Sequence, residues 1–117
     1  MMDSGQYARN IGGPLLAESL RHYRDPDGDR CHPVAKRVLD RWALEEPNRV
    51  RLLCADPVKI EWLLDAAQDQ GGVELELLTS VAAQRRRECG ETDTDLLLEA
   101  GVALQMPDSL PFRHCDR

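Results

Sequence analysis

Aromatic residues are scarce in this chain, and their scarcity limits how a core can be built. Its 117 residues include two Trp, two Tyr and one Phe. A core for one domain of this length must therefore come mainly from leucine, valine and alanine. We expect a single domain over residues 1–117, with loosely ordered ends at 1–13 and 105–117.

Positive charge is also in short supply. The chain has 15 lysines and arginines against 21 aspartates and glutamates, a formal net charge of −6. Nucleic acids are bound largely through lysine and arginine side chains that neutralise phosphates. Only Arg85–Arg87 forms a local basic run, so we expect no direct binding of nucleic acid.

The chain lacks segments that would direct it out of the cytoplasm. Its first residues do not follow the signal-peptide pattern, and no apolar run reaches the ~18 residues of a membrane span. The four cysteines, at positions 31, 54, 89 and 115, form no CxxC pair. We therefore expect a cytoplasmic protein with free thiols and no membrane partner.

Catalytic motifs are missing as well. The chain has no GxSxG, no Walker loop and no GxGxxG, which are the signatures of serine hydrolases and nucleotide-binding folds. Cys89 follows three arginines, but no histidine stands at an informative spacing from it. We expect no enzyme and no cofactor, with a thiol enzyme or redox sensor as the alternative.

One stretch, YRDPDGDRCHP, resembles a calcium loop. Asp25, Asp27 and Asp29 match the first three ligand positions of an EF-hand. That pattern then needs a glycine and a glutamate where the chain has Arg30 and Lys36. Proline and glycine in the same stretch indicate a turn, so we predict a turn that precedes a helix rather than a calcium site.

Zinc is the second metal to consider. Cys31-His32 and His114-Cys115 could together supply four ligands. Adjacent cysteine and histidine residues do not match the usual ligand spacing of zinc sites. We therefore predict no metal, and expect His32 to cap the helix that follows it.

The middle of the chain alternates between two patterns. Residues 49–55 and 73–78 place apolar side chains at every second position, which is typical of half-buried strands. Between them, Asp56 is a good N-cap, Pro57 a good first helical residue, and Gly71-Gly72 a good helix end. The predicted fold class is therefore α/β (α+β), with a small strand–helix–strand centre and two short strands.

Flanking helices complete this predicted fold. We expect helices that begin at Pro14 and Pro33, a short helix over 81–89, and a last helix that carries residues 96–104. Thr92 and Asp95 resemble a capping box for the last of these.

The helix predicted over 57–70 has more apolar surface than one sheet can cover. One stripe contains Ile60, Leu63, Leu64 and Ala67, and a second, about 140° around the axis, contains Val58, Trp62 and Ala66. The second stripe must contact another helix of the same chain or a partner. Two strands alone are also marginally stable and leave open edges, so either the chain contains a further strand or the sheet continues into a partner. We expect a homodimer, which would join two such units into one sheet.

Three segments resemble a known family of small bacterial regulators. In order, they are HPVAKRVLDRW, RVRLLCADPVKIEWLLDAAQDQ and GGVELELL. Together with the size and acidity of the chain, they resemble quorum-sensing antiactivators of the QslA type from pseudomonads. The resemblance implies a partner, a LasR-type transcriptional activator that the antiactivator keeps from dimerising and from binding DNA.

The predicted function is therefore a non-enzymatic regulator that binds and inhibits another protein. A binder of this kind places aliphatic and aromatic anchors in a desolvated patch. The candidate partner-binding residues are Val58, Trp62, Leu96, Leu97, Leu98, Val102 and Leu104, each of which could instead belong to the core. Immunity proteins and antitoxins are also small acidic binders and remain alternatives.

Overall fold

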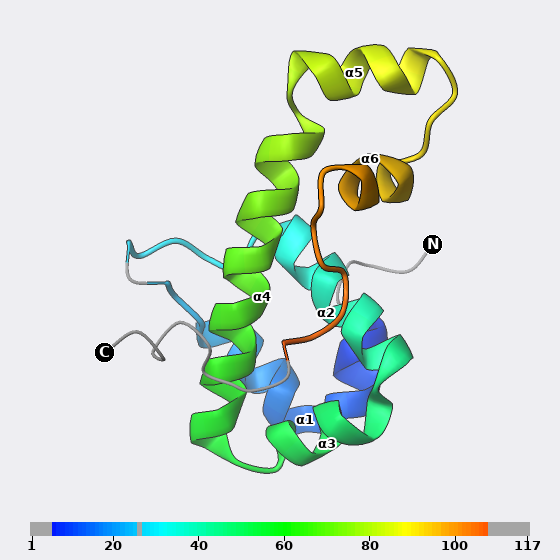
Figure 1. Cartoon of the computed structure of the whole chain (residues 1–117). Helices are drawn as coiled ribbons and strands as arrows, with labels where there is room; N and C mark the ends of the chain where they lie inside the picture. The colour runs from blue at the N-terminus through cyan, green and yellow to red at the C-terminus, as the bar shows by residue number, and fades with distance from the viewer. Residues whose placement is uncertain (1–5, 26, 108–117) are drawn as a thin grey trace.

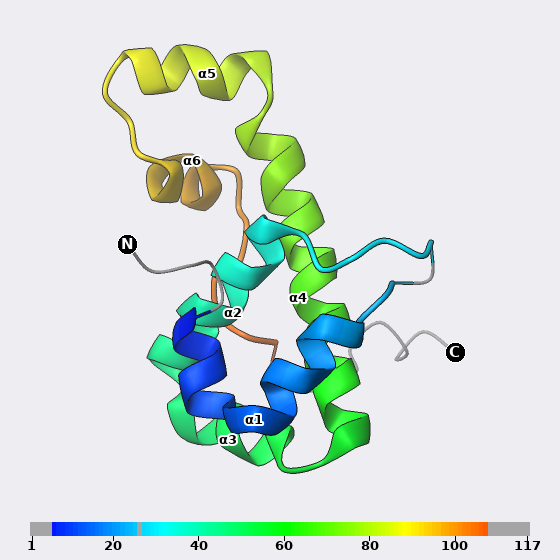
Figure 2. The ribbon, with the colours of Figure 1, turned by 180° about the vertical axis from the view of Figure 1, so that it is seen from behind.

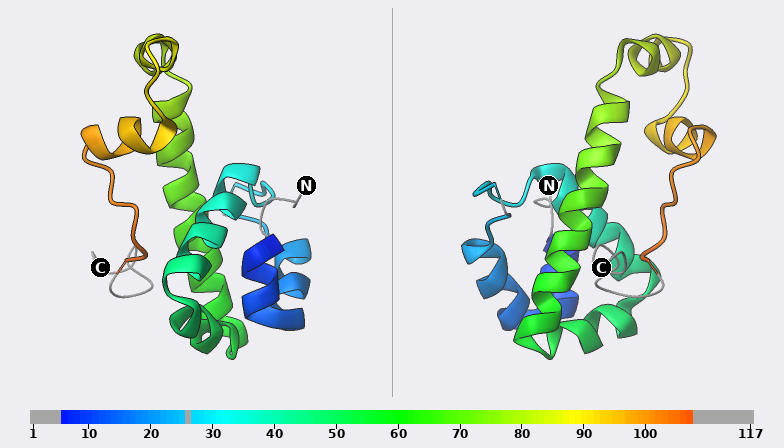
Figure 3. Two further views of the ribbon diagram at one scale, coloured as in Figure 1. Left: turned by 90° about the vertical axis from the view of Figure 1, so that its right-hand side faces the viewer. Right: turned by 60° about the vertical axis from the view of Figure 1, so that its left-hand side comes forward.

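The computed structural model describes residues 6–25 and 27–107, and these residues form six helices and no strand. The helices are α1 Gln6–His22, α2 Pro33–Glu45, α3 Pro47–Cys54, α4 Pro57–Leu78, α5 Val81–Glu88 and α6 Asp93–Glu99 (Figure 1). The first four helices pack around one core. The long helix α4 extends beyond them, and α5 and α6 lie beside its far end (Figure 3).

The predicted α/β fold class is wrong. The first predicted strand, residues 49–55, lies mostly in α3, and the second, residues 73–78, is the end of α4. Over so few residues, a period of 2 and a period of 3.6 are hard to separate. Val50 and Cys54 are four residues apart and buried on one helix face, whereas Leu52 between them is 73% exposed. A strand would have placed all three on the same side.

A homodimer formed by joining two sheets therefore has no basis in this fold. The residues that the structure describes contain no strand whose edge a second copy could extend. Homodimerisation itself stays a prediction.

The predicted end of the central helix at Gly71-Gly72 is also wrong, because α4 continues to Leu78. Gly71 serves close packing instead. A Cβ atom placed on it would lie 2.8 Å from the backbone nitrogen of Ala35, so α2 and α4 can approach each other here only through a glycine.

The helix starts that we predicted from capping residues are confirmed. The side chains of His32, Asp56 and Thr92 each accept a hydrogen bond from a backbone N–H in the first turn of α2, α4 and α6. Asp95 completes the capping box with Thr92, and prolines occupy the first turns of α2, α3 and α4. These caps satisfy N–H groups that have no partner within the helix.

Helix α1 is two helical segments joined at a kink. Gly13 has φ of 78°, a left-handed conformation that favours glycine, and Pro14 begins the second segment as predicted. The first segment was not predicted, but the chain is helical from Gln6 onward. It is held against α2, where the backbone N–H of Ala8 donates to the carboxylate of Asp40 at 2.8 Å.

The last helix is shorter than predicted. It ends at Glu99, and Gly101 adopts a left-handed φ of 81°, as glycines after helix ends commonly do. Val102 and Leu104 therefore do not lie on α6. They belong to a segment, residues 101–107, that returns along α4 and α2 toward the first four helices (Figure 1).

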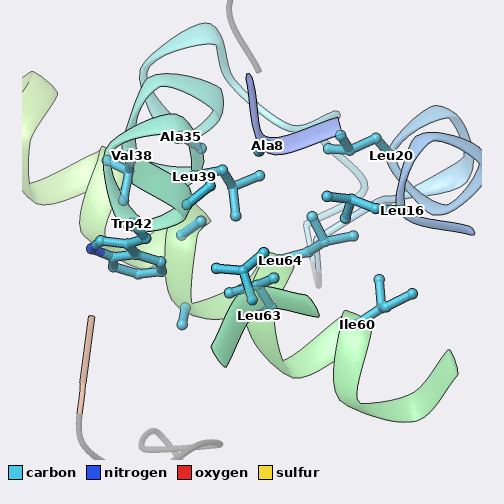
Figure 4. Packing of buried hydrophobic residues seen from close by; sticks show 14 of the residues in the cluster. Ala8, Leu16, Leu20, Ala35, Val38, Leu39, Trp42, Ile60, Leu63 and Leu64 are labelled. Carbon is cyan, nitrogen blue, oxygen red and sulfur yellow. The ribbon is translucent and has the colours of Figure 1, made fainter. Parts of the chain in front are cut away.

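We call the larger group of buried side chains the main core. Side chains of α1, α2 and α4 point into one space in Figure 4. Its largest fully buried members are Trp42, Leu16, Leu39, Ile60, Leu63, Leu64, Val38 and Val50. The expectation of a mainly aliphatic core agrees with this set, in which Trp42 is the one aromatic residue. Its indole nitrogen donates to the carbonyl oxygen of Leu104 at 3.1 Å, which satisfies a polar group that would otherwise be costly to bury.

A second, smaller cluster lies at the other end of the molecule. Its buried members are Leu78, Ala83, Leu96 and Leu97. We call α5, α6 and this cluster the distal arm. The arm contacts the rest of the chain through the end of α4 and through residues 101–107.

Within residues 6–25 and 27–107, none of the helices has the length and hydropathy that crossing a membrane requires.

Candidate partner-binding surface

The outer face of α4 carries apolar side chains that the main core does not cover. Val58 is 59% exposed and Val73 is 54% exposed, while Trp62 between them is half-buried. At 100° per residue these three side chains fall within an arc of about 60°. The opposite face holds the buried residues of α4, from Ile60 to Leu78. The two-sided character predicted for this helix is therefore confirmed for Val58 and Trp62.

The predicted second stripe is partly covered. Ala66 is buried and belongs to the main core, together with Met106 from the segment that returns beside α4. Val73, which falls in the second predicted strand, lies on α4 instead, where it is exposed and continues the surface. We call Val58, Trp62 and Val73 the α4 outer face.

Acidic residues share the α4 outer face with its apolar side chains. At 100° per residue, Asp69 and Glu76 fall within the same arc, and Asp65 lies about 20° outside it. Glu61 and Glu76 are exposed, and Asp65 and Asp69 are half-buried beside them along the same helix. Asp65 accepts a hydrogen bond from the Tyr23 hydroxyl at 2.7 Å. Burial, together with this carboxylate, raises the pKa of Tyr23 above its ordinary value, so the phenol keeps its proton. A surface that combines apolar side chains with carboxylates suits a basic, apolar partner.

The other predicted partner-binding residues lie elsewhere and do not join this surface. Leu96 and Leu97 are buried in the distal arm, and Val102 and Leu104 pack half-buried against the same cluster. Leu98 is exposed on the outside of α6. The start of α4 and helix α6 lie at opposite ends of the molecule (Figure 1), so the seven predicted residues do not form one site.

A buried ion pair that the sequence analysis did not predict lies between α2 and α4. Glu74 is only 4% exposed, and Arg41 contacts both of its carboxylate oxygens, with the shorter N–O distance at 2.7 Å. Gln70 donates to Glu74 at 2.7 Å and to the carbonyl oxygen of Ala103 at 2.9 Å. Arg41 also donates to the carbonyl oxygen of Leu104. The network therefore fixes the returning segment against α2 and α4.

The sequence contains a signal for this network, but it can be recognised only when residues 73–78 are assigned to the same helix as residues 57–70. On one continuous helix, Glu74 falls on the same face as Leu63, Ala67 and Leu78. A glutamate at a core position predicts a buried cationic partner. Because we assigned residues 73–78 to a strand, Glu74 was placed on a polar face instead.

The aspartate stretch forms a turn, as predicted. One carboxylate oxygen of Asp25 accepts hydrogen bonds from the backbone N–H groups of Asp27 and Asp29, at 2.9 and 2.8 Å. These bonds, with that from Asp29 the most important, hold the pKa of Asp25 below its ordinary value. Gly28 has φ of 89°, which the turn requires. Over the described ranges, 6–25 and 27–107, no group of three or more potential metal ligands occurs; His114 and Cys115 lie outside them.

The thiols differ in their surroundings. Cys54 is buried, as predicted, although on a helix rather than a strand, and Cys31 is buried too. Burial raises the pKa of each to about 11, so neither is a reactive thiolate near neutral pH. Cys89 is exposed at the end of α5.

The basic run is largely engaged in ion pairs of the distal arm. Arg86 pairs with Glu91 and Glu99, and Arg87 pairs with Asp93 at 2.8 Å. Arg87 also donates to the carbonyl oxygen of Leu78 at 2.6 Å. Two of the three arginines therefore join α5 to α6 and to α4, which favours a structural role over contact with phosphates.

Comparisons with known proteins add no family: no protein-family model matches this chain, and no curated protein or solved structure matches it either.

Proposed function

We propose that this protein is a non-enzymatic regulator that binds another protein through the α4 outer face. The observation that carries the proposal is the exposure of Val58 and Val73 on a helix whose opposite face is buried within the protein. Exposed aliphatic side chains beside a half-buried tryptophan provide the anchors that partner interfaces use.

The chemistry of the surface favours one kind of partner. The α4 outer face combines three apolar side chains with carboxylates that lie among and beside them. We propose that its occupant is an amphipathic helix of the partner, with an apolar stripe against the three side chains and basic residues against the carboxylates. Bound in this way, the protein would cover that helix and block its use in dimerisation or DNA binding.

A transcriptional activator of the LasR type is the first partner to test. The resemblance to QslA-type antiactivators rests on size, acidity and the order of three segments. Its strand order does not hold in the described structure, so the support for this partner comes from size, acidity and the free apolar face. Inhibition of such an activator remains part of the proposal.

The test uses two variants that change the same kind of side chain at different places. Val58→Asp with Val73→Asp introduces charge on the α4 outer face, and Leu52→Asp does so at an exposed leucine of α3. Binding of a purified LasR-type activator domain, measured by calorimetry, should be retained by Leu52→Asp and lost by the α4 variant. A captured partner from the source organism would be tested in the same way.

Equal binding by the wild type and the α4 variant would overturn the proposed surface. Circular dichroism must show that both variants are helical, because all three side chains are exposed and their substitution should leave the fold intact.

A further inference from the structure

A groove beside α1 gathers positive charge in a chain that is acidic as a whole. Its volume is about 800 Å³, and its lining includes Arg9 and Arg21 from the two segments of α1, Arg30 from the following loop and Lys36 from α2. Figure 2 shows these two segments as the arms of a bend in front of the main core. The kink at Gly13 separates the arms and so opens the groove.

The cations in this groove are poorly compensated. Glu18 is the one carboxylate in the lining, and it already pairs with Arg21 and His22. Arg9 donates to the neutral amide of Gln6 at 3.1 Å. Within residues 6–25 and 27–107, neither Arg30 nor Lys36 has a side-chain hydrogen bond or ion pair. A concave surface lined by one sign of charge concentrates ligands of the opposite sign.

The remaining lining of the groove is apolar. Pro14, Ala17 and Leu20 line it from α1, and the buried thiol of Cys31 lies among them. Burial keeps this thiol protonated, because its pKa is raised to about 11, so it adds no negative charge. Small-molecule sites commonly combine apolar walls with a few placed polar groups, in volumes of about 300–1,000 Å³.

We propose that this groove binds a small organic anion, with its carboxylate or phosphate head held by Arg9, Arg30 and Lys36 and its apolar body on Pro14, Ala17 and Leu20. Guanidinium groups match the paired oxygens of such heads, and the ammonium of lysine adds a point charge. The site lies on α1 and the start of α2, so it is independent of the partner-binding role proposed for α4.

The experiment titrates four probes into the isotope-labelled protein and follows backbone amide chemical shifts. The first two probes, 1-naphthyl phosphate and 2-naphthoate, carry the two possible heads on one apolar body. Inorganic phosphate supplies a head alone, and 2-naphthol supplies the body without charge. We expect saturable shifts at residues 9–21 and 30–36 with at least one of the first two probes, and the tighter of them identifies the head.

A charge-matched pair of variants tests the assigned cations. Arg30→Gln with Lys36→Gln removes two cations from the groove, and Arg37→Gln with Arg85→Gln removes two exposed cations outside its lining. The groove variant should bind at least about tenfold more weakly, since each lost charge-assisted hydrogen bond changes affinity by roughly that factor. The control variant should bind like the wild type.

Three results would overturn the binding of an anion by the assigned cations. The first is no saturable binding of either naphthyl anion, and the second is equal binding by the wild type and the groove variant. The third is binding of 2-naphthol as tight as that of the anions, which would show that charge is not recognised. Inorganic phosphate bound as tightly as 1-naphthyl phosphate would overturn the role of the apolar wall.

Discussion

The main core and the distal arm are stabilised in different ways. The main core buries large aliphatic side chains and Trp42 between four helices, and it includes one buried ion pair at its border. The distal arm buries only four side chains, and its two short helices are joined by ion pairs that are partly exposed. Partly exposed ion pairs contribute little and are screened by salt. We infer that the arm opens more readily than the core.

The largest effect should come from the centre of the main core. Trp42→Ala removes a side chain that is 1% exposed, together with its hydrogen bond to Leu104. We expect a loss of about 3–5 kcal/mol in the free energy of unfolding, measured by urea denaturation. A loss below 1 kcal/mol would mean that Trp42 does not hold the returning segment and the four helices together.

The buried ion pair should come next. Glu74→Ala leaves Arg41 without its carboxylate in a site where the arginine is about one quarter exposed. We expect a loss of about 2–4 kcal/mol, somewhat reduced by this exposure. Arg41→Met combined with Glu74→Met should recover much of the loss, because no uncompensated charge stays buried. If the double variant is as unstable as the single one, the network matters through its bonds to the returning segment.

A core substitution in the distal arm should act locally. Leu97→Ala removes a buried side chain from the small cluster, which should destabilise the arm by about 2–3 kcal/mol. Backbone amides of α5 and α6 should then exchange with solvent faster, while those of α2 and the first half of α4 change little. Equal acceleration in both regions would show that the arm and the main core unfold as one unit.

The smallest effects should come from the ion pairs of the arm. Arg86→Gln breaks the contacts with Glu91 and Glu99, and it should speed exchange in α5 and α6 at low salt but not in 1 M salt. Arg85→Gln is the matched control. An equal effect of the two variants would show that only the loss of charge matters.

The same contacts should make the arm sensitive to acid. The hydrogen bonds from Arg86 hold the pKa of Glu99 below its ordinary value of 4.5. A carboxylate whose pKa is lowered in the folded state stabilises that state at pH values above the ordinary pKa of the group. This contribution is lost as the pH falls through the lowered value, so methyl resonances of the arm should broaden below about pH 4.5 before those of the main core do.

Local chemistry was readable in the sequence, and pairing between distant segments was not. The caps at His32, Asp56 and Thr92 follow from interactions within four residues, and each was predicted. The assignment of residues 49–55 and 73–78 failed because short apolar patterns fit both periodicities. Only the approach of α2 at Gly71 and the pairing of Glu74 with Arg41 distinguish the helix from the strand.

The candidate surface was likewise predictable only as far as local sequence patterns reach. The sequence identified two apolar faces on the helix that begins at Pro57, but it could not tell which residues another segment covers. Ala66 is covered, whereas Val58 and Val73 are exposed. The seven predicted anchors are split between two ends of the molecule, because α6 packs against the end of α4 and not beside its start.

By itself, then, the amino-acid sequence determined the helix starts, the aliphatic character of the core and the turn at the aspartate stretch. Each depends on neighbouring residues or on composition, where propensity and capping act. The tertiary structure decided that α4 is continuous, that Glu74 is buried, that α4 leaves one face open, and that four cations share a groove. These features depend on which distant side chains cover or neutralise each other, and a local pattern does not contain that information.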